Sequence, residues 1–241
     1  MVKPNPSLTK TFIAAMALAA IAGTAFASLN SHTLHPSLTL ALLALAAATS
    51  RMKAKLPGID GSMSVNLPFL LLAVMNLSAV EAVFIACVST MVQCWPKRNG
   101  KFRSDQLFFN VSMMAFATSV ASLTWNAGWL GKTAWASEPL MLASTTMAFF
   151  VGQTAPVAVI IKLAEGAVMR RVWFGIVQMC FPYYVLSASV TSMADLVSRH
   201  SGWRPLIVLP IMYGVHRSFR FYFRQEAVHA APMARVASAG S

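Results

Sequence analysis

The stretch from Val65 to Trp95 contains a single charged side chain, that of Glu81. One membrane-spanning helix needs about 20 apolar residues and two need about 40, so this stretch is long for one span and short for two. The polar sequence Asn76-Leu77-Ser78 lies at its middle. We therefore predict two short helices, folded as a hairpin that need not reach the far surface, with both ends on one side of the membrane.

The composition of the whole chain is that of a membrane protein. Hydrophobic residues make up 57% of the 241 and charged residues 11%, whereas soluble proteins carry about 25% charged residues. The net charge of +12 comes from short basic clusters between apolar segments, which is typical of loops at a lipid surface rather than of a nucleic-acid interface. The three cysteines form no CxxC pair, so we predict packing roles for them and no metal site.

The apolar segments predict an all-α polytopic bundle. We expect about eight of them, including the two short helices within 65–95; the other six are residues 11–29, 37–50, 105–125, 139–163, 172–197 and 203–224. Residues 1–229 then form one integral membrane domain, and residues 230–241 form a short flexible tail. Ala25-Phe26-Ala27 before Ser28 is similar to a signal-peptidase site, but the first segment is long enough to span, so we favour its retention.

The basic clusters decide the predicted orientation, because Lys and Arg accumulate in short cytoplasmic loops. If the N-terminus is cytoplasmic, most basic clusters fall on the same side, and the only poor fit is the loop with Arg199 and Arg204. The chain is therefore predicted to be a multi-pass protein with both termini in the cytoplasm. The clusters assigned to the cytoplasmic side are those at Lys3 and Lys10, at residues 51–55, 97–103 and 162–171, and after residue 216.

Polar side chains inside apolar segments are candidates for a binding site, because they are costly at membrane depth. We predict a ligand pocket formed by Glu81, Asn110, Gln153 and Gln178, which lie on different segments. Two alternatives remain open at this point. Glu81 can be favoured by the dipole of the helix that it begins, at a hydrated hairpin tip. The three amides can form hydrogen bonds between helices that only hold the bundle together.

The last segment becomes basic and aromatic toward its end. Arg217, Arg220 and Arg224 are three and four residues apart and so share one helical face. We predict that this face contacts anionic lipid or a protein partner, and simple anchoring at the membrane interface is the alternative.

Motifs of known catalytic sites are missing from the sequence. It has no GxSxG, HExxH or phosphate-binding glycine loop, and the loops between segments are too short for a soluble catalytic domain. We therefore predict a protein that is not an enzyme and needs no cofactor.

Several motifs, taken in their order along the chain, are shared with one family. They are residues 51–58 (Arg-Met-Lys-Ala-Lys-Leu-Pro-Gly), residues 61–67, Glu81-Ala82-Val83, residues 107–111, Arg171-Val172-Trp173, Phe181-Pro182-Tyr183-Tyr184 and residues 209–223. Over residues 10–229 the chain resembles the integral membrane (MASE-like) sensor domains of bacterial signalling proteins. In that family these domains precede GGDEF diguanylate cyclase or HD-GYP phosphodiesterase domains.

The resemblance implies a sensor module in the bacterial cytoplasmic membrane whose last helix reaches an output domain. After His229 this chain continues as an Ala/Ser/Gly tail instead of a charged linker helix, so we expect a module without an output domain that acts through a partner. Two alternatives stay open. One is a capture subunit of an energy-coupling transporter, whose Ala-rich first helix would match Ala15 and Ala19; the other is an accessory subunit of a membrane complex.

Overall fold

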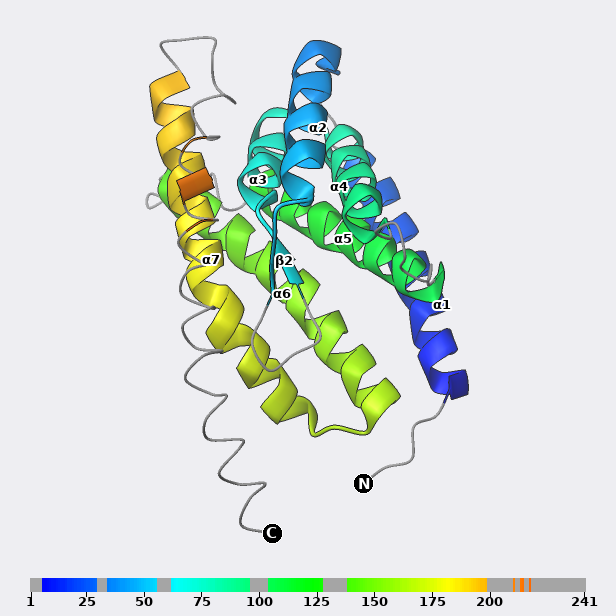
Figure 1. Cartoon of the computed structure of the whole chain (residues 1–241). Coiled ribbons are helices and arrows are strands. Elements are labelled where there is room, and N and C mark those ends of the chain that lie inside the picture. Colours follow the sequence, from blue (N-terminus) through cyan, green and yellow to red (C-terminus); the bar gives the residue numbers. More distant parts are fainter. Residues whose placement is uncertain are drawn as a thin grey trace, which may run out of the picture.

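The computed structural model describes residues 6–29, 34–55, 62–95, 104–127 and 138–198, together with the single positions 210, 213, 214 and 217. This part of the chain folds into seven helices and one small ribbon of two strands (Figure 1). The helices are α1 (Pro6–Ser28), α2 (Pro36–Ser50), α3 (Leu67–Asn76), α4 (Ala79–Cys94), α5 (Ser104–Trp125), α6 (Glu138–Glu165) and α7 (Met169–Ser198).

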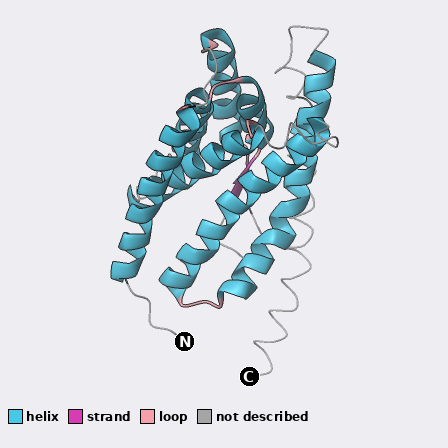
Figure 2. Cartoon of the chain, turned by 180° about the vertical axis from the view of Figure 1, so that it is seen from behind, coloured by secondary structure: helices cyan, strands magenta, loops and turns pink. Residues whose placement is uncertain are grey.

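Four of the described helices, α1, α5, α6 and α7, are long and apolar enough to cross a membrane. Among them α5 is the most buried, because it packs against α1 on one side, α6 on another, and also against α3 and α4. The helices α6 and α7 run side by side as an antiparallel pair (Figures 1 and 2). The predicted all-helical bundle is confirmed, and its four long apolar helices fit a membrane protein.

The predicted hairpin of short helices is also present. Helix α3 has 10 residues and α4 has 16. Both are therefore shorter than the length of about 20 residues that crosses the hydrocarbon core. The chain turns between them at Leu77 and Ser78, within the predicted polar sequence.

The described residues do not contain the expected total of eight apolar segments. Their seven helices match the first seven predicted segments. The predicted segment 203–224 lies outside the described residues except for four single positions.

A two-stranded antiparallel ribbon was not predicted. Strand β1 (Lys53–Lys55) pairs with β2 (Ser62–Ser64), with Lys53 opposite Ser64 and Lys55 opposite Ser62. Strands as short as these carry no periodic signal that a sequence pattern can detect. Figure 2 shows how small this element is beside the helices.

The core of the described region is centred on α3. Every residue from Leu67 to Val74 is buried, and Phe69 and Leu71 have no exposed surface. The reason is that α3 packs against α2, α4, α5 and α7, so it has neighbours on several sides. A helix that is apolar all round is expected in such a position.

Two glycines set the geometry around α6. Gly166 follows the helix with a φ of 68°, which a residue with a side chain rarely adopts, and its N–H donates to the carbonyl of Lys162 at 2.9 Å. This closes α6 and turns the chain toward α7. Gly152 lies against α5, where an added Cβ would be 3.1 Å from the Cα of Ala117, so the two helices approach closely at this point.

Candidate functional site

Glu81 lies in the first turn of α4 and is 8% exposed. Its Oε1 accepts hydrogen bonds from the backbone N–H of His35 at 3.0 Å and from the hydroxyl of Thr39 at 2.7 Å. Its Oε2 accepts from the backbone N–H and the hydroxyl of Ser78, at 3.1 and 2.7 Å. The carboxylate therefore accepts four hydrogen bonds from the protein itself.

These partners show that Glu81 joins the starts of two helices. Ser78 is the N-cap of α4, and its exchange of hydrogen bonds with Glu81 forms a capping box. His35 is the N-cap residue of α2. A negative charge at the positive ends of two helix dipoles is favourable, so the position is well explained by fold stability. Glu81 is buried, whereas one of the alternatives left open by the sequence placed it at a hydrated hairpin tip. Its position at the start of a helix, where the helix dipole favours a carboxylate, is as expected.

The three amides predicted to share a pocket with Glu81 lie in separate places. Asn110 on α5 is half-buried, with its Nδ2 3.3 Å from the Sγ of Cys94 on α4. Gln153 on α6 is half-buried and accepts a hydrogen bond from the hydroxyl of Tyr184 on α7. Gln178 on α7 is exposed. Two of the three therefore connect neighbouring helices, which is the packing alternative left open above.

The predicted basic face falls largely outside the described residues. Arg217 is described and exposed, whereas Arg220 and Arg224 are not among the described positions. Among the residues that are described, no three His, Cys, Asp or Glu side chains are placed to hold a metal ion.

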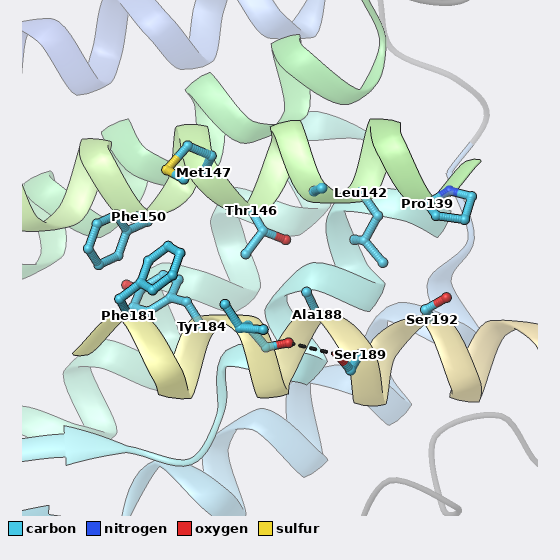
Figure 3. A pocket seen from close by; sticks show the side chains of 12 residues that line it. Pro139, Leu142, Thr146, Met147, Phe150, Phe181, Tyr184, Ala188, Ser189 and Ser192 are labelled. Atoms are coloured by element: carbon cyan, nitrogen blue, oxygen red, sulfur yellow. Dashed lines mark hydrogen bonds between the residues drawn. The ribbon is translucent and has the colours of Figure 1, made fainter. Parts of the chain in front are cut away.

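A cavity of about 480 Å³ lies between α6 and α7 and is open along one side, where Met147, Phe181 and Val185 are exposed (Figure 3). It extends along α6 from Pro139, in the first turn, to Phe150, a distance of about three helical turns. None of the four predicted ligand-binding residues lines it. The side chains that do are Pro139, Leu142, Ala143, Thr146, Met147 and Phe150 of α6, and Phe181, Tyr184, Val185, Ala188, Ser189 and Ser192 of α7.

Three aromatic rings close one end of this cavity. Phe150 meets Phe181 edge to face with centroids 5.8 Å apart, and it meets Tyr184 in the same way at 4.9 Å. Edge-to-face pairs are a favoured arrangement of aromatic rings. The opposite end of the cavity lies near Pro139 and Ser192, toward the start of α6 and the end of α7 (Figure 3).

The lining of the cavity includes a buried threonine hydroxyl without a partner, one of several such hydroxyls in the described residues. Thr146 is 6% exposed, and its Oγ1 has no hydrogen-bond partner among the described residues. Figure 3 shows its side chain pointing from α6 toward α7. The hydroxyl of Ser189 across the cavity instead donates to the carbonyl of Val185 at 3.0 Å. Sequence analysis singled out the motif Phe181 to Tyr184 but not Thr146, because a threonine in an apolar helix carries no signal of its own.

No protein-family model, curated protein or solved structure matches this chain.

Proposed function

We propose that the chain is a multi-pass membrane module that binds a small, mainly apolar molecule between α6 and α7 and transmits this binding to a partner, without catalysing a reaction. The observation that carries the proposal is the cavity of about 480 Å³ between these two helices. The sensor role comes from the resemblance in sequence, and the binding site comes from the geometry of the helix pair.

The size and lining of the cavity support a ligand site. Small-molecule sites commonly measure about 300 to 1,000 Å³ and are lined by apolar and aromatic side chains with a few placed polar groups. The cavity has this character, with aromatic rings at one end and the hydroxyl side chains of Thr146, Ser189 and Ser192 in its lining. Helix bundles often bind ligands between facing helices in the same way.

The distribution of basic residues supports one orientation of the protein in the membrane. Lys162, Arg170 and Arg171 are exposed around the turn between α6 and α7, and Lys10 is exposed near the start of α1. Figure 1 shows these two regions toward the same end of the bundle. Because basic residues favour the cytoplasmic side, we assign this end to the bacterial cytoplasm together with both termini. The cavity then lies in the opposite half, nearer the outer surface.

The first test asks whether the cavity holds a molecule. The chain is purified in lipid nanodiscs and the intact particle is analysed by native mass spectrometry. We expect a retained small molecule that is lost in the variant Ala188→Phe, which fills the cavity from α7. Ala164→Phe is the matched control, because Ala164 is exposed on α6 outside the cavity. Absence of any bound molecule, or equal retention by both variants, would refute the binding role.

A second test separates a sensor from a capture subunit. Hydrogen exchange is measured with and without the retained molecule. A sensor should show changed protection at the turn formed by residues 166–168, at the far end of α6 from the cavity. A subunit that only captures its ligand should show protection confined to the cavity walls, and that result would count against signalling.

A further inference from the structure

The cavity between α6 and α7 occupies about one half of the length of both helices. Their candidate membrane spans are Glu138–Ala164, of 27 residues, and Met169–Leu196, of 28 residues. Phe150 lies next to the middle of the first span, and Phe181 and Tyr184 lie on either side of the middle of the second. From this aromatic end the cavity extends to the start of α6 and toward the end of α7 (Figure 3).

The length of the cavity matches the depth of one leaflet of a bilayer. From Pro139 to Phe150, α6 rises by about 16 Å, at about 1.5 Å per residue. The hydrocarbon core of a bilayer is about 30 Å thick, so each leaflet contributes about 15 Å. With the middle of each span at the centre of the bilayer, the aromatic end of the cavity lies at that centre and the other end lies at the membrane surface. This is the depth that the tails of lipids fill.

The cavity is also open to the surroundings of the helix pair along its length. Met147, Phe181 and Val185 are exposed at the opening, whereas Leu142 and Phe150 are each 4% exposed and lie deeper between the helices. An exposed apolar face of a membrane-spanning helix contacts lipid. A lipid tail can therefore enter sideways from the bilayer, while the rest of the lipid stays outside the protein.

The lining and the volume of the cavity fit such a tail. None of the side chains around it carries a charge, and burying an unpaired charge there would be far costlier than burying an apolar chain. The cavity measures about 480 Å³. If each carbon atom takes about the volume of one liquid water molecule, about 30 Å³, a chain of about 16 carbon atoms fills it.

We propose that the ligand is one tail of a phospholipid, which lies along the cavity from the membrane surface to the bilayer centre and ends against the rings of Phe150, Phe181 and Tyr184. These rings then set the length of the tail that the site prefers. This inference rests on the proposed binding function and names the class of molecule that the site accepts.

The test compares phosphatidylcholines that differ only in tail length. The chain is placed in nanodiscs made from an equimolar mixture of the dilauroyl, dipalmitoyl and diarachidoyl lipids, and native mass spectrometry measures which of them the protein retains. Tails are equally apolar in the bilayer and in the cavity, so selection depends on the contacts that each tail makes. We expect the dipalmitoyl lipid to be retained about threefold more than the dilauroyl lipid, whose shorter tail leaves part of the lining without contacts. The diarachidoyl lipid should gain nothing over the dipalmitoyl lipid, because the rings stop its tail.

Two variants change the cavity in opposite ways. Phe150→Ala removes a ring from the closed end and should raise the ratio of retained diarachidoyl to dipalmitoyl lipid by a similar factor, about threefold. Phe149→Ala is its matched control, because Phe149 is fully buried beside it and does not line the cavity. Ala188→Phe fills the cavity from α7 and should abolish the selection, whereas Ala164→Phe, on the exposed part of α6 outside the cavity, should leave it intact.

The outcomes separate this inference from the function beneath it. Equal retention of the three lipids by the wild-type protein, or the same selection in wild type and Ala188→Phe, would mean ordinary contact with surrounding lipid and would overturn the inference. Selection that is lost in Ala188→Phe but unchanged in folded Phe150→Ala would overturn the role of the rings. A different retained molecule, lost on Ala188→Phe without any selection among lipids, would overturn the ligand class and leave the binding function standing. If nothing is selected and nothing is retained, both proposals are wrong.

Discussion

Two regions of the molecule bury polar oxygen atoms in apolar surroundings, and these oxygens differ in whether they have hydrogen-bond partners. At the junction of α2 and α4, the carboxylate of Glu81 accepts four hydrogen bonds from the protein. Between α6 and α7, the hydroxyl of Thr146 has no partner among the described residues. The first arrangement is complete by itself, as expected of a group that stabilises the fold. The second has no hydrogen-bond partner and is itself buried, as are the hydroxyls of Ser122 and Thr145.

Charge alone therefore does not identify a site in a membrane protein. Glu81 is the more conspicuous residue in the sequence, because it is the only charged side chain between Val65 and Trp95. Its contacts nevertheless explain its presence without any ligand. The residues that line the cavity carry no charge, and most of them are inconspicuous in the sequence.

The largest effect is expected from Glu81→Ala. This change leaves the buried N–H of Ser78 without its acceptor and removes the hydrogen bonds from His35 and Thr39 that join α2 to α4. We therefore expect it to lower the free energy of unfolding by about 3 kcal/mol. Glu81→Gln keeps one acceptor and should cost about half as much. Unfolding by denaturant in detergent measures both. Asp105→Ala, at the exposed first turn of α5, is the control and should cost less than about 1 kcal/mol, the effect of a helix dipole.

The Glu81 variants also test whether the two regions have different roles, one in stability and the other in binding. A Glu81→Ala protein that keeps its stability but loses the molecule retained in nanodiscs would assign Glu81 to a ligand site, as the sequence predicted. Loss of stability with the bound molecule still present in the folded fraction would confirm the division between the two regions.

A smaller effect is expected from Gly152→Ala on the face of α6 that packs against α5. The added methyl group would lie 3.1 Å from the Cα of Ala117, so α6 must move away from α5. We expect a net loss of about 1 to 2 kcal/mol, since overpacking outweighs the gain in helix propensity.

Gly23→Ala is the matched control for this close approach. Its new Cβ would meet the Cβ of Ser119 at 3.4 Å, an ordinary contact. The propensity gain of about 0.5 kcal/mol should therefore prevail. Equal unfolding temperatures for the two variants would contradict the close approach at Gly152.

Ser78→Ala isolates the capping box from the rest of the Glu81 junction. The variant loses the side-chain cap of α4 while the contacts of Glu81 with His35 and Thr39 can remain. The expected cost is about 1 kcal/mol, the usual value for an N-cap residue. Denaturant unfolding measures it, and a cost as large as that of Glu81→Ala would mean that the contacts with α2 contribute little.

The smallest effect is expected from Gln178→Ala. The side chain of Gln178 is exposed and does not line the cavity, so stability should change by less than about 0.5 kcal/mol. Ligand retention in nanodiscs should also be unchanged. A loss of the bound molecule in this variant would show that the binding site extends beyond the α6–α7 cavity and that Gln178 binds the ligand, as the sequence predicted.

Much of the fold could be predicted because it depends on local sequence. The length of the stretch from Val65 to Trp95 and the polar Asn76-Leu77-Ser78 sequence were enough to predict two short helices and the turn between them. The spacing of Ser78 and Glu81 is that of a capping box, a contact within one helical turn. The contact of Glu81 with His35 could not be predicted, since 46 residues separate them and nothing in either segment specifies the other.

The sequence by itself determined that this chain is a bundle of apolar helices with basic loops, because hydropathy, charge and capping act within one segment. Tertiary structure alone decided which polar groups find partners. Glu81 is satisfied because α2 begins beside it, and the cavity takes its lining from α6 and α7, which only the fold brings together. The physical reason is that a hydrogen bond or a cavity depends on how two separate helices pack, and packing between helices is not encoded in the pattern of either one.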